Sequence, residues 1–193
     1  MRGRQRLVGA AFLLMLGAAS EAAAQSTLWA YGFVAPGIYR TASVIATSYE
    51  RDFVTPRTFE IFRDTEPVVA WGGGVEWQFY KRVAIAADVG AMHLIEEPYY
   101  PGGLLAVNGA YHFGESQQRW VPFLAAGYSF GLDAQRGFDG AVGVNYWFRQ
   151  RAGLRLELRA TSLKYDIESP NWPDPSEWMI GFRAGLNFAR RSF

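Results

Sequence analysis

Hydrophobic and polar residues alternate along much of the chain beyond its first two dozen residues. Residues 154–164 show the pattern most clearly, with Leu154, Leu156 and Leu158 on one face and charged residues between them. A period of two residues is typical of a β-strand whose two faces meet different surroundings. The same alternation predicts strands over residues 69–79, 83–91, 104–113, 138–148 and 178–188.

The predicted strands number eight, because residues 28–39 and 120–130 are also strand-like, although mixed faces leave their phase open. The segments between strands alternate in length. Short turns fall near residues 80–82, 114–119 and 149–152, and longer connections cover residues 40–66, 95–103, 131–137 and 165–177. Short turns at one end and long loops at the other describe an up-and-down order of strands. The sequence therefore predicts an all-β fold, an eight-stranded antiparallel up-and-down transmembrane β-barrel with its long loops outside.

Two features favour a membrane barrel over a soluble one such as a lipocalin. The polar faces of several strands hold mainly alanine and glycine, which suit a narrow interior that eight strands nearly fill. Aromatic residues gather beside the turns, for example Trp77, Tyr80, Phe113 and Trp120, as they do in the interfacial belts of membrane barrels. A water-facing exterior would instead be rich in charged side chains.

The first 24 residues have the organisation of a secretory signal peptide. Three arginines precede an apolar run over residues 7–19, and residues 22–24 are alanines. This order of charge, apolar run and small residues predicts a cleaved leader. The apolar run is shorter than a membrane-spanning helix needs. We therefore expect a signal peptide over residues 1–24, a barrel domain over residues 25–193 and export to the cell outer membrane.

Composition narrows the choice of function. The chain has 193 residues, of which 50% are hydrophobic and 19% charged, so it fits one folded domain. A formal net charge of +1 argues against a strongly basic nucleic-acid binder, and we expect no nucleic-acid partner. The chain has no cysteine, which excludes disulfide bonds and cysteine-ligated zinc.

The closing segment, Gly181–Phe188, together with the leader and the eight alternating strands, resembles the small outer-membrane β-barrel family. That family includes the membrane domain of outer-membrane protein A and outer-membrane protein X. The resemblance implies that an aromatic residue near the end of the last strand is recognised by the barrel-assembly machinery. It also implies periplasmic chaperones, outer-membrane lipids and lipopolysaccharide as partners. We expect the assembly signal at Phe182, Leu186 and Phe188. Phe193, the last residue, is the alternative, but Arg190 and Arg191 break the alternation before it, which favours Phe188.

Catalytic and metal-binding patterns are weak. Lipid A deacylases of barrel fold need a serine near a histidine, and neither His93 nor His112 has one two residues on. Metal binding needs several convergent ligands, and two histidines on different strands are a weak signal. Residues 72–74 are glycines inside a strand, where glycine marks curvature or close packing rather than a phosphate loop. We expect no enzyme activity, cofactor or metal.

One set of charged residues shares the polar faces of the predicted strands. Arg155, Glu157 and Arg159 point the same way because they are spaced by two residues. In an eight-stranded barrel this face lines a narrow lumen, where arginines form directed ion pairs with carboxylates. We predict a lumen charge network made of Glu76, Asp88, Asp139, Arg155, Glu157, Arg159 and Arg183. Such a network is expected to plug the lumen, and a gated narrow pore is the alternative.

The long connections are the other candidate place for function. Residues 40–66 and 165–177 combine charges of both signs with aromatic residues, which can mark a surface for an extracellular ligand. The simpler interpretation is a solvated rim. The sequence as a whole predicts a monomeric barrel with a structural or surface-interaction role. A narrow porin-like channel is the second choice, and a lipid A-modifying enzyme the third.

Overall fold

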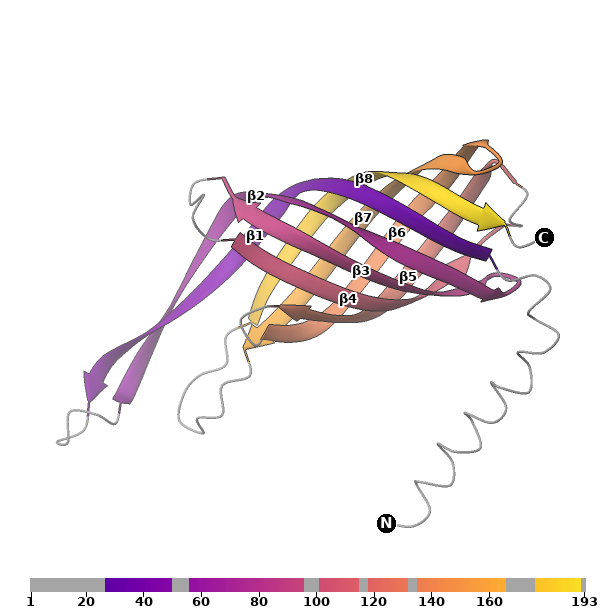
Figure 1. The fold of residues 1–193 in the computed structure, drawn as a ribbon. Helices are drawn as coiled ribbons and strands as arrows, with labels where there is room; N and C mark the ends of the chain where they lie inside the picture. The colour runs from indigo at the N-terminus through magenta and orange to yellow at the C-terminus, as the bar shows by residue number, and fades with distance from the viewer. Residues whose placement is uncertain are drawn as a thin grey trace, which may run out of the picture.

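The computed structural model describes residues 27–49, 56–95, 101–114, 118–131, 135–165 and 176–191, and the predicted signal peptide lies outside these ranges. The described chain forms eight strands, each antiparallel to its neighbours, in one closed barrel (Figure 1). The strands are β1 (Thr27–Tyr49), β2 (Pro56–Tyr80), β3 (Val83–Leu94), β4 (Pro101–His112), β5 (Trp120–Gly131), β6 (Gln135–Arg149), β7 (Ala152–Tyr165) and β8 (Ser176–Arg191). The predicted fold class is confirmed.

The first strand closes the barrel by pairing with both the second strand and the last. In β1, Phe33 lies opposite Gly72 of β2 and opposite Gly185 of β8. Each strand within the ring therefore has a hydrogen-bonded neighbour on both sides, which leaves no open sheet edge there. Closure of this kind is what allows β-strands to exist inside a lipid bilayer.

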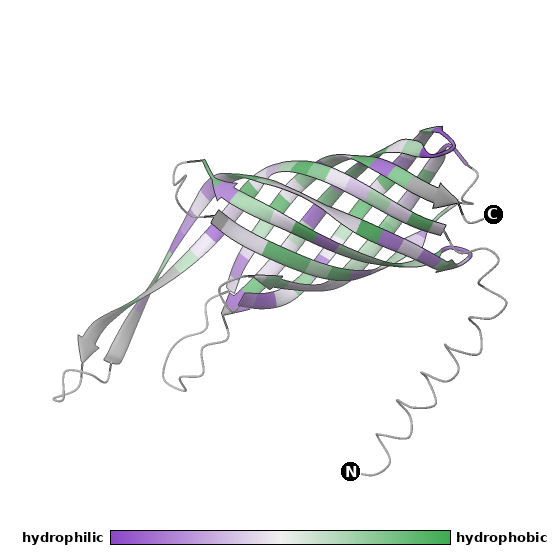
Figure 2. Cartoon of the chain, in the orientation of Figure 1, coloured by the Kyte–Doolittle hydropathy of each residue, from purple (hydrophilic) through white to green (hydrophobic). Residues whose placement is uncertain are grey.

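The two faces of the sheet differ sharply in polarity. Along β7, the outward Leu154, Leu156 and Leu158 are 41%, 37% and 51% exposed, whereas the charged residues between them are buried. Figure 2 shows the alternation itself, with hydrophobic and more hydrophilic residues following one another along the strands of the barrel and further hydrophilic residues at the turns. The alternation expected for residues 69–79, 83–91, 104–113, 138–148, 154–164 and 178–188 is confirmed in the burial pattern.

The structure also settles the phase of the two ambiguous strands. On β1 the inward residues include Trp29, Tyr31, Phe33 and Tyr39, and on β5 the fully buried Phe123 points inward. The outward positions of these strands are also mostly apolar. Both faces are therefore hydrophobic, which is why alternation alone could not separate inside from outside.

The connection expected over residues 40–66 is wrong. Pairing of β1 with β8 ends at Arg40 opposite Trp178, but pairing of β1 with β2 continues to Tyr49 opposite Pro56. Residues 41–49 and 56–66 form a two-stranded ribbon, here named the outer arm, that projects from one end of the barrel (Figure 1). Its β-branched and aromatic content favours strand structure despite its charges. Only residues 50–55 of the expected loop lie between the two strands.

Three other connections are also shorter than expected. Strand β4 begins at Pro101 and β6 at Gln135, inside the loops expected over residues 95–103 and 131–137. Of the expected 165–177 connection, Ser176 and Glu177 belong to β8. The short turn at residues 80–82 is confirmed, and Lys81 has a φ of 32° there, a left-handed conformation suited to a tight turn.

Candidate functional site: a buried charge network across the barrel

The barrel interior brings together all seven charged residues expected in the lumen. They come from five different strands and each is buried, with at most 6% of its surface exposed. Glu76 lies on β2, Asp88 on β3, Asp139 on β6, Arg155, Glu157 and Arg159 on β7, and Arg183 on β8. Inward side chains of different strands meet in layers inside a small barrel, so residues that are far apart in sequence come into contact there.

Glu157 is the centre of this network. Its Oε2 accepts a hydrogen bond from Nε of Arg155 at 3.0 Å, and its Oε1 accepts one from Nε of Arg159 at 2.6 Å. Arg183 lies directly opposite Glu157 in the pairing of β7 with β8, and its Nη1 is 3.7 Å from the same Oε1. Three guanidinium groups thus surround one carboxylate, and the spacing of two residues along β7 is what places two of them.

A second carboxylate, Glu76, extends the network toward the short-turn end. Nη1 of Arg155 donates to Oε2 of Glu76 at 2.9 Å, while Nε2 of His112 lies 2.7 Å from Oε1. His112 is fully buried and packs edge-on against Trp29, with ring centroids 5.0 Å apart. His112 was not expected in the network, although its inward position in the 104–113 alternation was a usable signal.

The guanidinium of Arg155 also lies over two aromatic rings. Its Cζ is 4.0 Å from the ring centre of Phe123 and 4.8 Å from that of Tyr31. Cation–π contact of this kind stabilises a desolvated arginine. Phe123 can reach this position because Gly143, on the neighbouring β6, has no side chain in its way.

Replacing Gly143 with alanine should therefore destabilise the barrel. The new Cβ would lie 2.5 Å from the backbone oxygen of Leu156 and 2.6 Å from the ring of Phe123. Overpacking of this kind costs about 1–3 kcal/mol. Gly109→Ala is the matched control, since its Cβ meets nothing closer than 3.9 Å. Urea unfolding of both variants in micelles measures the difference, and equal midpoints would contradict the packing described here.

The remaining ion pairs of the network lie on the side of Glu157 that faces the outer arm. Nη1 of Arg159 lies 2.7 Å from Oδ2 of Asp139 and 3.5 Å from Oδ2 of Asp88. Asp88 also accepts from Nη1 of Arg183 at 3.1 Å and from the Tyr31 hydroxyl at 3.3 Å. Further support comes from the Ser129 hydroxyl, which donates to Asp139 at 3.0 Å, and from the ring of Phe33, which lies 4.1 Å beneath Arg183. Tyr31, Phe33 and Ser129 had no charge signal by which the sequence could have assigned them.

Four carboxylates and three arginines make up the ionic part of the network. With His112 neutral the set carries one net negative charge, and with His112 protonated it is balanced. Buried ions of either sign are tolerated only when paired and hydrogen-bonded. The network meets that requirement with side chains from all eight strands once His112, Tyr31, Phe33 and Ser129 are included.

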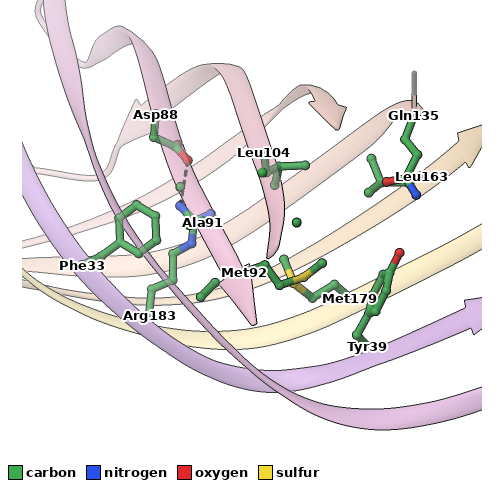
Figure 3. Close-up of a pocket in the computed structure, with 14 residues that line it drawn as sticks. Phe33, Tyr39, Asp88, Ala91, Met92, Leu104, Gln135, Leu163, Met179 and Arg183 are labelled. Atoms are coloured by element: carbon green, nitrogen blue, oxygen red, sulfur yellow. Dashed lines mark hydrogen bonds and ion pairs between the residues drawn. The ribbon is translucent and has the colours of Figure 1, made fainter. Parts of the chain in front are cut away.

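A cavity lies between this network and the outer arm. Its volume is about 40 Å³, room for a few water molecules. Figure 3 shows the Asp88–Arg183 pair with Phe33 at one side of it and Tyr39, Gln135 and Leu163 at the other, with Met92 and Met179 between. The charged network thus separates this cavity from the half of the interior nearer the short turns.

Glu177 was expected on an exposed loop, and that expectation is wrong. Its side chain is buried at the arm end of the barrel, where it accepts hydrogen bonds from the Tyr39 hydroxyl, from the backbone amide of Ala42 at 3.2 Å and from Nε2 of Gln135 at 3.0 Å. The free amide of β1 just beyond its pairing with β8 explains the inward turn of this carboxylate. Glu177 thereby anchors the base of the outer arm.

The residues assigned to assembly lie on the outer face of β8. Phe182, Leu186 and Phe188 are all exposed and share one face at a spacing of two to four residues. Phe193 lies outside the described residues. Recognition by an assembly factor remains a prediction.

The histidines lie apart from each other. His93 is on β3 and stacks against the outward Trp71 with ring centroids 6.4 Å apart, whereas His112 is inside. Within the described residues, no group of three or more histidine, cysteine or acidic side chains could hold a metal ion. The described part of the chain also contains no helix long and apolar enough to cross a bilayer.

A closed ring of eight strands with an apolar outside and a paired, charged inside is the decisive arrangement, because a soluble barrel has the opposite faces. This is the architecture of a small outer-membrane β-barrel. Its aromatic belt near the short turns includes Trp77, Tyr80, Phe113, Trp120 and Phe148, all exposed.

The chain is similar to several solved structures, at low sequence identity. No family model matches the chain, and no curated protein matches it. Among solved structures, it is similar to the N-terminal β-barrel domain of Pseudomonas aeruginosa OprF, at 18% identity over 82% of this chain and 97% of that one, with a TM-score of 0.45. Neisserial surface protein A matches at 15% identity over 83% and 96%, with a TM-score of 0.49. Pseudomonas aeruginosa OprG matches at 10% identity over 86% and 96%, also with a TM-score of 0.49.

Proposed function

We propose that this protein is a non-enzymatic, monomeric barrel of the cell outer membrane with a plugged lumen and a structural or surface-interaction role. The observation that carries the proposal is the charge network, which joins β2, β3, β6, β7 and β8 across the interior by ion pairs of 2.6–3.7 Å. Eight strands enclose little space, and here that space holds paired side chains. Any contact with a partner is then made by the ends of the barrel and not by its lumen.

The outer arm is the part best suited to contact a partner. It extends past the barrel, and its exposed side chains combine Ile45, Ile61 and Phe62 with Glu60 and Arg63. Apolar residues interleaved with charges on a projecting segment are typical of a recognition surface. The connection expected over residues 165–177, of which residues 166–175 lie outside the described residues, is a second proposed contact region. Lipopolysaccharide, other outer-membrane lipids, periplasmic chaperones and the barrel-assembly machinery are the further partners that we propose.

Planar-bilayer recording of the refolded barrel tests the plug. We expect no stepwise conductance from the parent protein, because paired side chains fill the narrow interior that eight strands enclose. Frequent brief openings of the parent would contradict the plug and support the alternative, a narrow gated channel. The cavity beside the Asp88–Arg183 pair favours that alternative, since it already opens part of the path.

Two further measurements test membrane placement and the enzyme alternative. The barrel should migrate differently on a gel before and after boiling, because a closed barrel resists detergent until heated; equal migration and solubility without detergent would contradict the membrane placement. Lipid A from producing cells should have an unchanged mass. A changed lipid A mass that depends on His112 or His93 would contradict the non-enzymatic assignment.

A further inference from the structure

The short-turn end of the barrel is basic on every one of its three turns. Five exposed side chains, here named the basic ring, carry this charge: Lys81, Arg82, Arg119, Arg149 and Arg151. Among the described residues of these turns, 80–82, 113–114, 118–119 and 149–151, no side chain is acidic. Glu115 lies outside the described residues. Five positive charges without a described acidic neighbour form a surface of one sign.

The basic ring lies directly beyond the aromatic belt. Nζ of Lys81 is 5.6 Å from the ring centre of Tyr80, and Arg119 immediately precedes Trp120, whose ring packs on Tyr146 at 4.4 Å. Aromatic belts mark the level of lipid headgroups. Side chains one or two residues past the belt therefore reach the depth of the lipid phosphates.

The opposite end of the barrel is different. There the exposed side chains of the outer arm include Glu60 and Asp64 as well as Arg63, and Arg136 and Lys164 occupy paired positions at the rim. Charge of both signs is ordinary for a solvated surface. The single-sign charge of the basic ring is therefore a local property and not a feature of the whole exterior.

We propose that the basic ring binds the phosphate groups of anionic phospholipids in the leaflet that it faces. This inference rests on the proposed membrane placement. Basic residues just outside a membrane are attracted to anionic headgroups, and arginine adds bidentate hydrogen bonds to phosphate oxygens. A soluble polyanion would find the same charges, but the continuity of the ring with the aromatic belt favours lipid. Bound phospholipid fixes the depth of the barrel and distinguishes its two ends.

The preference of the barrel for anionic over zwitterionic phospholipids can be measured from the lipids that it retains. The full chain is inserted into vesicles of equimolar phosphatidylglycerol and phosphatidylcholine and then extracted with mild detergent, and the lipids that remain bound are counted. We expect phosphatidylglycerol to be enriched by roughly threefold or more. Extraction in about 1 M NaCl should return the ratio to near one, because the screening length falls to about 3 Å. Equal retention at low salt, or enrichment unaffected by salt, would overturn the proposal.

Substitutions locate the site. Exchange of all five basic-ring residues for glutamine should abolish the enrichment, whereas the control variant Arg63→Gln, Arg136→Gln, Lys164→Gln, at the other end, should keep it. Enrichment that persists in the first variant, or disappears in the second, would overturn the assignment to the basic ring. If the first variant does not insert, the salt series on the parent decides. A parent chain that fails to enter vesicles contradicts the membrane placement, while one that enters without lipid preference contradicts only this inference.

Discussion

Replacing Glu157 with alanine should destabilise the barrel by about 3–5 kcal/mol, at the low end of that range where water reaches the interior. The substitution removes the carboxylate that Arg155 and Arg159 contact at 3.0 and 2.6 Å, and leaves these arginines with buried charge that is only partly compensated. Unfolding by urea in lipid vesicles, followed by the gel shift between folded and unfolded forms, measures the loss.

Glu177→Ala is a matched control for this experiment, since Glu177 is equally buried but its described hydrogen bonds come from neutral groups. Removing the Glu177 carboxylate leaves neutral hydrogen-bond donors unpaired instead of leaving buried charges, so the expected loss of stability is about 1–3 kcal/mol. In the same series, a plugged lumen predicts little conductance from Glu157→Ala, whereas a gated pore predicts that this variant opens more often than the parent. Unchanged stability together with unchanged conductance would show that Glu157 does not organise the network.

Leu156→Arg should impair insertion of the barrel, because it places a charge on the lipid-facing surface. The expected effect is about 2–4 kcal/mol near the bilayer midplane. Leu163→Arg on the same strand should be milder, since Leu163 points inward, is 4% exposed and lines the cavity beside Asp88. Vesicle insertion of both variants, scored by protease protection and gel shift, makes the comparison. Equal insertion of the two would mean that the faces of β7 are wrongly assigned.

Much of the architecture follows from the amino-acid order, because in-and-out alternation is a local property. On β7 a leucine and a charged residue take turns, and burial follows that alternation residue by residue. Where both faces are apolar, the rule has nothing to distinguish. Trp29, Tyr31 and Phe33 therefore concealed the phase of β1, even though their rings fill the interior.

The outer arm could not be predicted, since its charges and its proline resemble those of a loop. What decides its structure is pairing between residues such as Val44 and Ile61, which a single sequence does not reveal. The partners within the network had the same limitation. The alternation predicts that Glu76 and Arg155 point inward, but their 2.9 Å contact spans 79 residues and depends on the order of strands around the ring. For His112, the missing information was the register that sets the depth of β4 relative to β2, from which it is separated by β3.

The outer arm and the barrel wall are one piece of hydrogen-bonded ribbon, and this has a mechanical consequence. Strand β1 runs without interruption from the arm, past Tyr39 at the Glu177 anchor, to Tyr31, whose hydroxyl contacts Asp88. A force that pulls on the arm acts along β1, and the hydrogen bonds of Glu177 to Tyr39 and Ala42 resist sideways movement at the base of the arm. The arm is thus connected through a single strand to Tyr31, so a force applied to the arm acts on the strand that contacts the ion pairs at the centre of the barrel.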